Sequence, residues 1–158
     1  MKLNADVVIV GSGVAGLFSA LNLPEKQEII LITKSDLESS DSFLAQGGIC
    51  VLRDEKDYDS YFEDTMKAGH YENRKESVDI MIRNSRDIIN DLVKYGVEFE
   101  KKDGKFAYTR EGAHSRPRIC FHEDITGKEI TTTLLSHVKK LTLSLIHISE
   151  PTRLRRIS

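Results

Sequence analysis

Residues 6–16 read DVVIVGSGVAG, and this stretch decides the fold. Residues 6–10 are a run rich in β-branched side chains without polar alternation, which is typical of a buried parallel strand. The glycines that follow have the GxGxxG spacing, and residues 17–23 predict a helix that ends before Pro24. A second apolar run at residues 28–33 predicts another buried strand. A strand, a glycine-rich turn, a helix and a second strand within about thirty residues form the unit that binds a dinucleotide pyrophosphate.

Each of the three glycines in this turn has a physical reason. Gly11 permits the tight turn out of the strand, Gly13 lets a diphosphate approach the backbone, and Gly16 lets the helix pack closely on the strand. The N–H groups and the positive dipole end at the start of the helix attract phosphate. We therefore predict cofactor contacts from six consecutive residues, Gly11, Ser12, Gly13, Val14, Ala15 and Gly16.

The end of the second strand departs from the nicotinamide pattern. The standard fingerprint has Asp or Glu there, which binds the ribose hydroxyls. This chain has Thr33 followed by Lys34, so plain NAD binding is disfavoured. Lys34 could contact a phosphate or a ribose, or it could be a solvated strand end.

Composition and charge exclude several classes of protein. The chain has 158 residues, of which 39% are hydrophobic and 30% charged, and 23 basic against 25 acidic residues give a net charge of −2. Such a balance favours neither nucleic acid nor an anionic membrane. Cys50 and Cys120 fit no disulfide framework and no CxxC metal site, which indicates reduced thiols in a cytoplasmic protein. Residues 5–23 are too interrupted by glycine for a membrane helix and lack the features of a signal peptide.

The loop at residues 39–49 reads SSDSFLAQGGI and ends in small residues. Gly47 and Gly48 permit close approach of a flat ligand, and Gln46 offers both a hydrogen-bond donor and an acceptor. The alternative is a flexible surface loop. Cys50, just after it, is interpreted as a small buried apolar residue, because nothing marks its pKa as low.

Several of these motifs resemble one flavoprotein family, which contains L-aspartate oxidase, fumarate reductase and the succinate dehydrogenase flavoprotein subunit. The resemblance covers residues 4–141. The matching stretches are GSGVAGL at 11–17, TK at 33–34, SFLAQGGI at 42–49, FEDTMKAG at 62–69, YGVEF at 95–99 and TREGAHS at 109–115.

This resemblance implies an α/β fold, a Rossmann-like FAD-binding domain that is truncated here and carries part of a helical and hairpin insertion. It implies FAD as the cofactor. The family's catalytic residues would lie beyond residue 141, so we name no catalytic residue, and we predict no metal site. Further cofactor-binding positions implied by the resemblance are Lys34, Asp41, Ser42, Phe43, Leu44, Ala45, Gln46, Gly47 and Gly48.

Two features favour the L-aspartate oxidase branch of this family. Respiratory members have the pattern HTVAAQGG, whose histidine links the flavin covalently, and the matching position here is Asp41. The flavin is therefore expected to be non-covalent. The run TREGAHS, with Arg118 and residues 122–127 after it, is also closer to the aspartate oxidase pattern, although Ala113 replaces the usual glycine.

The resemblance then implies that the parent protein oxidises L-aspartate to iminoaspartate, the precursor used for quinolinate and NAD synthesis, with oxygen or fumarate as electron acceptor. It implies that Glu111 lies near the amino group of the substrate, whereas the alternative for Glu111 is a salt bridge in a surface loop. The chain alone is expected to be inactive. The other hypotheses are a fumarate reductase or succinate dehydrogenase flavoprotein, and a non-enzymatic dinucleotide-binding fragment.

Residues 142–158, TLSLIHISEPTRLRRIS, differ in character from what precedes them. They show no helical or strand period, and SLIHISEPTR resembles a translated sequencing-adapter sequence. We therefore divide the chain into the N-terminal part of an FAD-binding domain at residues 1–141 and a non-native tail at 142–158. The alternative is a genuine C-terminal strand or helix.

The middle of the chain predicts helices and a hairpin. Asp57 is expected to cap a helix over 58–68, and Asn73 to cap a longer helix that ends near Tyr95. Residues 99–109 predict a hairpin with Asp-Gly in its turn, and Thr126 with Glu129 predicts a capping box. The apolar stripe of the long helix is expected to be core: Val78, Met81, Ile82, Ile88, Ile89, Leu92 and Val93.

Overall fold

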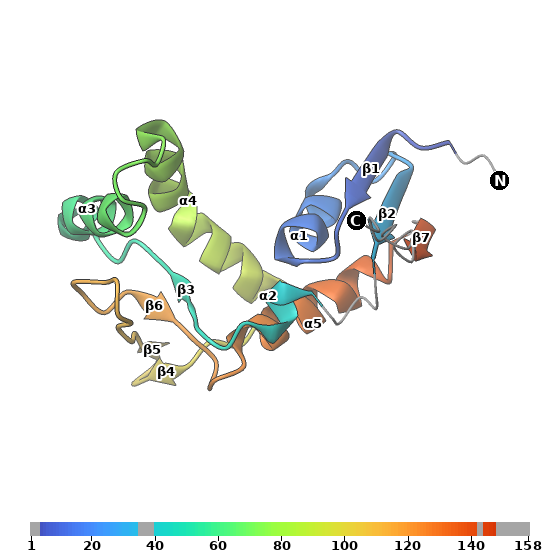
Figure 1. The fold of residues 1–158 in the computed structure, drawn as a ribbon. Helices are drawn as coiled ribbons and strands as arrows, with labels where there is room; N and C mark the ends of the chain where they lie inside the picture. Colours follow the sequence, from blue (N-terminus) through green and yellow to red (C-terminus); the bar gives the residue numbers. More distant parts are fainter. Residues whose placement is uncertain (1–3, 35–39, 142–143, 148–158) are drawn as a thin grey trace, which may run out of the picture. The chain divides into compact units, whose positions relative to one another are not determined.

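The computed structural model describes residues 4–34 and 40–141 and the backbone of 144–147. They form two compact units, Ala45–Glu129 as one and the segments on either side of it as the other. The helices and strands of both units are labelled in Figure 1. In the part of the chain that the structure describes, no helix is long and apolar enough to cross a membrane.

The flanking segments build a parallel sheet of three strands. Its order is β1 (Val7–Val10), β2 (Ile29–Thr33) and β7 (Ser144–His147), and helix α1 (Val14–Asn22) connects the first two. The register pairs Val7 with Ile29 and continues along both strands. The predicted strand, turn, helix and strand are thus confirmed, with the helix starting three residues earlier than expected, directly after Gly13.

The prediction of a fully buried first strand was wrong. Val8 is 54% exposed and Val10 is 80% exposed, whereas Leu31 of β2 is completely buried. The reason is that the described elements cover only one face of β1, because Val7 and Ile9 are half-buried and alternate with the exposed Val8 and Val10. An apolar run therefore identified the strand but not how well neighbouring elements cover it.

The tail contributes a strand that its sequence did not suggest. Ser144–His147 pairs in parallel with β2, with Ile30 opposite Ser144 and Thr33 opposite His147. This agrees with the alternative of a C-terminal strand, whereas the non-native origin of the tail stays a prediction. Residues 142–143 and 148–158 lie outside the described residues.

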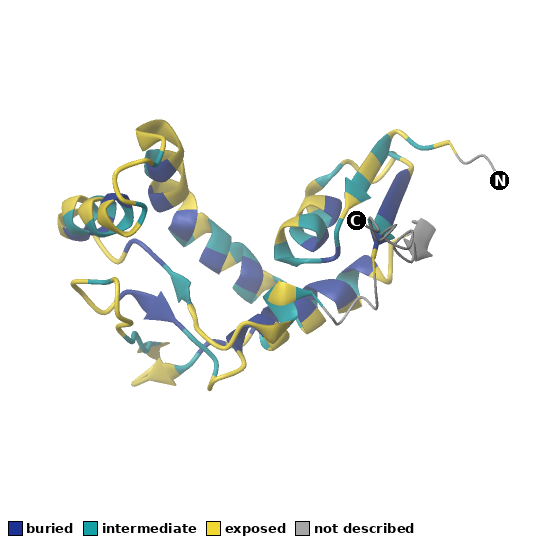
Figure 2. Ribbon diagram, viewed as in Figure 1, coloured by how far each residue is buried: buried dark blue, intermediate teal, exposed yellow. Residues whose placement is uncertain are grey.

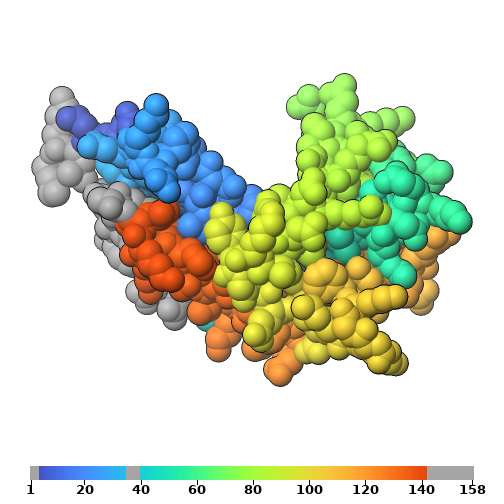
Figure 3. All heavy atoms as spheres, turned by 180° about the vertical axis from the view of Figure 1, so that it is seen from behind, coloured from blue at the N-terminus to red at the C-terminus, as the bar shows by residue number. Residues whose placement is uncertain are grey.

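The central unit is built from two helices, a short sheet and a hairpin. Helices α3 and α4 pack against each other, and strands β3 and β6 pair in antiparallel fashion. The hairpin reaches the surface that Figure 3 shows. The elements are β3 (Ile49–Cys50), a 3₁₀ turn η1 (Glu55–Asp57), α3 (Tyr58–Ala68), α4 (Lys75–Lys94), β4 (Lys101–Lys102), β5 (Lys105–Phe106) and β6 (Ile119–Cys120).

Two further helices lie at the junctions between the units. Helix α2 (Asp41–Leu44) is a single turn within the segment that we predicted to be a loop. Helix α5 (Thr126–Val138) starts in the central unit, and the residues from Ile130 onward belong to the other unit. The apolar face predicted for α5 is buried as far as Val138, and Leu141, beyond the end of the helix, is 36% exposed.

The core of the central unit includes one face of α4, which appears as a dark stripe in Figure 2. Val78 and Ile82 cluster there with Leu52, Tyr61 and Met66. The predicted core stripe was wrong in part, however. Met81 is 47% exposed and Ile88 is half-buried, because both lie at the border of the buried face and line a cavity instead.

The predicted helix caps are confirmed only in part, whereas the hairpin is confirmed. Asp57 does occupy the N-cap position of α3, but its side chain makes no capping hydrogen bond, and α4 starts after Arg74 rather than Asn73. The hydroxyl of Thr126 accepts from the N–H of His122, and the carboxylate of Glu129 accepts from the N–H of Glu98. These polar side chains hold neighbouring segments together. The hairpin turns at Asp103 and Gly104, whose φ angles are 53° and 75°, as a tight Asp-Gly turn requires.

Candidate functional site

The glycine-rich turn adopts the geometry that its spacing predicts. Gly11 has φ 109°, and its N–H donates to the carbonyl of Ile32 at 2.8 Å, so the chain turns sharply out of β1. A Cβ on Gly16 would overlap the carbonyl oxygen of Gly11 and crowd Ile9. Helix α1 therefore packs against the strand as closely as it does only because residue 16 has no side chain.

Two hydroxyl groups complete this turn. Ser12 and Thr33 are hydrogen-bonded through their hydroxyls at 3.0 Å in a buried position. Ser42, from α2, accepts a hydrogen bond from the N–H of Val14 at 3.2 Å, and a Cβ on Gly13 would lie 3.0 Å from its oxygen. The start of α1 thus combines backbone N–H groups, small residues and a hydroxyl, which suits an anionic diphosphate.

The remaining residues predicted to bind the cofactor differ in their location and exposure. Lys34 follows the end of β2 and is exposed, while Asp41 and Leu44 are exposed on α2 and Phe43 is half-buried. The run from Ala45 to Gly48 is exposed, although the carbonyl of Ala45 accepts a hydrogen bond from the N–H of Gly127.

Gly48 has a structural reason that the sequence did not suggest. A Cβ at this position would overlap the carbonyl of Cys120 and the side chain of Ile119. The glycine therefore permits the close approach of β3 to β6. Gly47 has a different neighbour, because a Cβ there would lie 3.2 Å from a carboxylate oxygen of Glu111. The structure thus brings together Gly47 and Glu111, which we had predicted for cofactor and substrate respectively.

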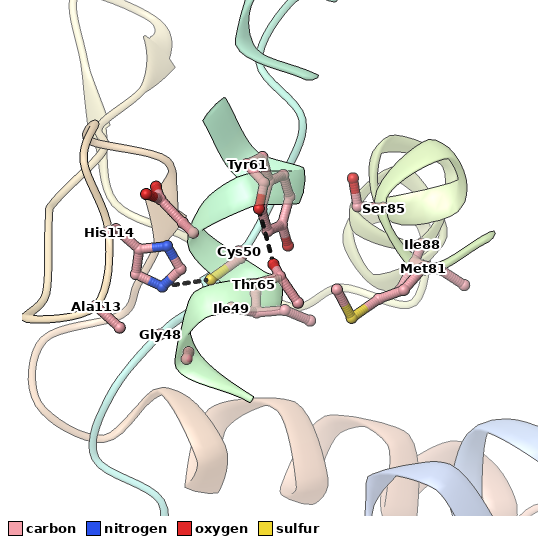
Figure 4. A pocket seen from close by; sticks show the side chains of 12 residues that line it. Gly48, Ile49, Cys50, Tyr61, Thr65, Met81, Ser85, Ile88, Ala113 and His114 are labelled. Atoms are coloured by element: carbon pink, nitrogen blue, oxygen red, sulfur yellow. Dashed lines mark hydrogen bonds between the residues drawn. The ribbon is translucent and has the colours of Figure 1, made fainter. Parts of the chain in front are cut away.

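A cavity of about 500 Å³ opens beside these residues in the central unit. Figure 4 shows its walls, formed by β3, α3, α4 and the loop that contains Ala113 and His114. Most of the lining is apolar, and Met81 and Ile88 of α4 contribute to it. An apolar wall with a few polar groups is the usual composition of a small-molecule site.

His114 and Cys50 are two of the polar residues that line this cavity. The Nε2 atom of His114 lies 3.2 Å from the Sγ atom of Cys50 (Figure 4). Burial raises the pKa of the Cys50 thiol, so the thiol is protonated at neutral pH. The prediction that Cys50 is a small buried apolar residue was therefore wrong about its environment. The side chain is half-buried and contacts a histidine.

An ionic cluster centred on Arg118 adjoins the cavity through Asp64, which lines it. The side chain of Arg118 is fully buried. Its Nε and Nη2 atoms donate to Asp57 at 3.1 and 2.9 Å, and Nη1 donates to Asp64 at 2.6 Å. Nη2 also donates to Ser60, and the guanidinium lies 5.0 Å from the ring centre of Tyr61. Nearly all donors of the side chain are thus used, as a buried arginine requires.

The cluster alters the titration of its members. Burial opposes the charge on Asp57 and Asp64, but other contacts outweigh it and hold both pKa values below the usual range. At Asp57 these are the hydrogen bonds of Arg118 and Ser60 and the charge of Arg118. At Asp64 they are the N–H of Ser115, followed by the Arg118 guanidinium. Burial also opposes the charge on Arg118, yet the two carboxylates raise its pKa above normal. All three groups are therefore ionised at neutral pH.

Our sequence interpretation missed this cluster. Asp57 was assigned a capping role, and Arg118 was noted only as part of a family pattern. One signal was present, since Arg118 directly precedes the apolar residues Ile119 and Cys120, where a charged side chain must find partners. Asp57 and Asp64, about two helical turns apart, could have been recognised as those partners.

Comparison with known proteins establishes the family. A family model described as FAD binding domain matches residues 6–158. The chain belongs to the FAD binding domain family. The predicted α/β FAD-binding fold and FAD as the cofactor are therefore confirmed.

Individual relatives agree with this family. The chain is 50% identical over 140 residues to an L-aspartate oxidase of Clostridium perfringens, covering 89% of this chain and 32% of the relative. It is 45% identical over 141 residues to the L-aspartate oxidase of Clostridium acetobutylicum, with the same coverage of 89% and 32%. The chain thus spans about a third of the length of these curated relatives.

Solved structures show the same fold. A mutant of the E. coli quinol fumarate reductase FrdA superposes with a TM-score of 0.84 at 25% identity, over 94% of this chain and 26% of that one. Mycobacterium smegmatis Sdh1 superposes with a TM-score of 0.77 at 27% identity, over 90% of this chain and 27% of that one. The resemblance to the family of these flavoproteins and L-aspartate oxidases is confirmed.

Proposed function

We propose that the whole protein is an FAD-dependent L-aspartate oxidase that produces iminoaspartate for NAD synthesis in the cytoplasm. The observation that carries this proposal is the likeness to L-aspartate oxidases, which extends over most of this chain. The sequence likeness to fumarate reductase and Sdh1 is much lower, although the fold is shared.

In this proposal the glycine-rich turn holds the diphosphate of FAD. The N–H groups at the start of α1 would bind its oxygens, with that of Val14 shared with Ser42, and Gly11 and Gly13 add no side chain to the approach. The hydroxyl of Ser42 lies at the same helix end and is available as a further hydrogen-bond partner. The exposed segment from Ala45 to Gly48 would hold the flavin portion, and Lys34 would bind the ribose or a phosphate.

The cofactor itself supplies the acceptor for a hydride from the substrate. This chain contributes binding and orientation. Asp41 occupies the position where respiratory members have the linking histidine, and a carboxylate cannot form that bond, so the flavin is held without a covalent link. Oxygen or fumarate then reoxidises the flavin.

Glu111 provides the feature that fits an amino acid substrate. Its carboxylate packs against Gly47, within the segment assigned to the flavin. A carboxylate in this position favours a substrate with an ammonium group, because the two carry opposite charges. L-aspartate has the ammonium, whereas succinate and fumarate lack it, so Glu111 distinguishes the two classes of substrate.

The test is an activity measurement on the purified whole protein. We expect hydrogen peroxide to form when L-aspartate is supplied in air, and we expect trichloroacetic acid to release all flavin into the supernatant. Glu111→Gln is expected to raise the KM for L-aspartate about tenfold, because a charge-assisted hydrogen bond becomes a neutral one.

Asp91→Asn, at an exposed salt bridge with Lys94, is the matched control and should leave the KM unchanged. Flavin that remains on the precipitated protein, together with oxidation of succinate but not of L-aspartate, would move the assignment to the respiratory branch.

A further inference from the structure

The loop that carries Glu111 is closed at its base and turned at its tip. The N–H of Thr109 donates to the carbonyl of Ile119 at 3.0 Å, and the N–H of Arg118 donates to the carbonyl of Thr109 at 3.1 Å. At the tip, the N–H of His114 donates to the carbonyl of Glu111 at 3.0 Å. Glu111 and His114 are therefore the first and last residues of one turn, so whatever fixes His114 also fixes Glu111.

The carboxylate of Asp64 attaches this turn to α3. One oxygen of Asp64 accepts from the N–H and the hydroxyl of Ser115, both at 2.7 Å. The same oxygen accepts from Nη1 of Arg118 at 2.6 Å. Because Arg118 is also bound to Asp57 at the start of α3, the anchor is fixed on both sides. The residue next to His114 is thus attached to a buried, charge-compensated group.

Arg118 also fixes the ring of His114. Nη1 of Arg118 lies 3.2 Å from Nδ1 of His114. A guanidinium can only donate, so Nδ1 must be the accepting nitrogen, and the ring hydrogen is on Nε2. That hydrogen points to the Sγ atom of Cys50, 3.2 Å away. The tautomer and the orientation of the ring follow from the contact with Arg118.

We propose that Asp64 and Arg118 are positioning residues that hold the turn of residues 111–114, and with it the Glu111 carboxylate against Gly47, for an amino acid substrate. This inference rests on the proposed function. Neither residue is assigned contact with substrate or flavin. Their effect is on the affinity for a dicarboxylate that carries an ammonium group, because only that substrate depends on the position of Glu111.

Asp64→Asn in the flavin-loaded whole protein tests this inference. It keeps the shape of the side chain and removes the charge that Arg118 and Ser115 bind. We expect the KM for L-aspartate to rise about tenfold, as for the loss of a charge-assisted hydrogen bond. The KM for fumarate, measured as fumarate reduction by a reduced dye, should not change, since fumarate has no ammonium group. Asp91→Asn is again the matched control.

Ser115→Ala is a milder second variant, because it removes one hydroxyl bond and leaves the pair of Asp64 and Arg118 intact. We expect its KM for L-aspartate to rise about threefold with unchanged flavin content. If Asp64→Asn does not fold, the KM of Ser115→Ala alone tests the positioning role. An unchanged KM for L-aspartate, or an equal rise for both substrates, would overturn the positioning role.

A double-mutant cycle separates this inference from the proposed function. Combined with Glu111→Gln, the Asp64→Asn change should add no further rise in KM, because both act through the same carboxylate. Additive effects would show that Asp64 acts by another route. If Glu111→Gln alone leaves the KM for L-aspartate unchanged, the assignment of Glu111 in the proposed function fails instead.

Discussion

Replacement of Arg118 by leucine should be the most destabilising single change in the central unit. The substitution removes the cation that compensates Asp57 and Asp64, whose side chains are 3% and 15% exposed. Asp64 would keep its hydrogen bonds from Ser115, and Asp57 would keep Ser60 and a 4.0 Å contact with Arg116, but both enclosed carboxylates would lose their close cation. Breaking a buried ion pair by removing one member costs about 3–5 kcal/mol. We expect a loss of that size in the free energy of unfolding at pH 7, measured by urea denaturation of the flavin-free whole protein.

The same variant should show a characteristic dependence on pH. In the wild type Arg118 lowers the pKa of both carboxyls, so their contribution is complete above the unfolded value, about 3.9, and is lost as the pH falls through the lower folded value. Without Arg118, only Ser60, Arg116 and Ser115 still oppose the effect of burial, so both pKa values rise relative to the wild type, and protonation relieves the uncompensated charge as the pH falls from 7 toward 4. The difference between variant and wild type should therefore shrink over that range.

An exposed ion pair provides the control for this experiment. Arg83 bonds Asp79 one turn away on α4, and both side chains are well exposed. Arg83→Leu should leave the unfolding midpoint close to that of the wild type, because exposed pairs contribute little. Equal losses for the two leucine variants, or a loss at Arg118 that stays constant from pH 7 to pH 4, would refute the buried cluster.

Three further predictions concern the glycines and the thiols. Gly13→Val should abolish flavin retention, because its side chain would crowd Ser42 and the diphosphate approach; normal flavin absorbance after gel filtration would remove the pyrophosphate assignment. Gly48→Ala should lower the unfolding free energy by about 1–3 kcal/mol, since the methyl group overlaps β6, whereas Gly112→Ala, with open space around it, should not; equal effects would contradict the close strand approach. Burial raises the pKa of Cys120 to about 12, so peptide mapping should find it unlabelled by iodoacetamide at pH 8 until urea is added; prompt labelling of the folded protein would be inconsistent with that burial.

The sequence predicts the nucleotide-binding unit well because its signals are local. The turn at Gly11 and the closeness of α1 to β1 at Gly16 depend on residues that are near one another in the chain. The exposure of Val8 and Val10 could not be predicted in the same way. It depends on which other segments cover the strand, and a short apolar run contains no information about that.

Contacts across long sequence separations explain most of what was missed. Arg118 binds Asp57 and Asp64 at separations of 61 and 54 residues, and no periodic pattern links such positions. A polar residue before a helix is ambiguous by itself, because it can cap the helix or bind a distant charge, and at Asp57 the charge prevails. Glu111 was identified only through the family resemblance, and its contact with Gly47 required the fold.

The most direct test of the central claim is anaerobic mixing of the flavin-loaded whole protein with substrate. Without oxygen, electrons that leave the substrate remain on the flavin, so its visible absorbance reports the first half-reaction alone. We predict that L-aspartate bleaches the flavin within one turnover and that succinate at the same concentration leaves it oxidised. A flavin that succinate bleaches and L-aspartate does not would contradict the proposed oxidation of L-aspartate.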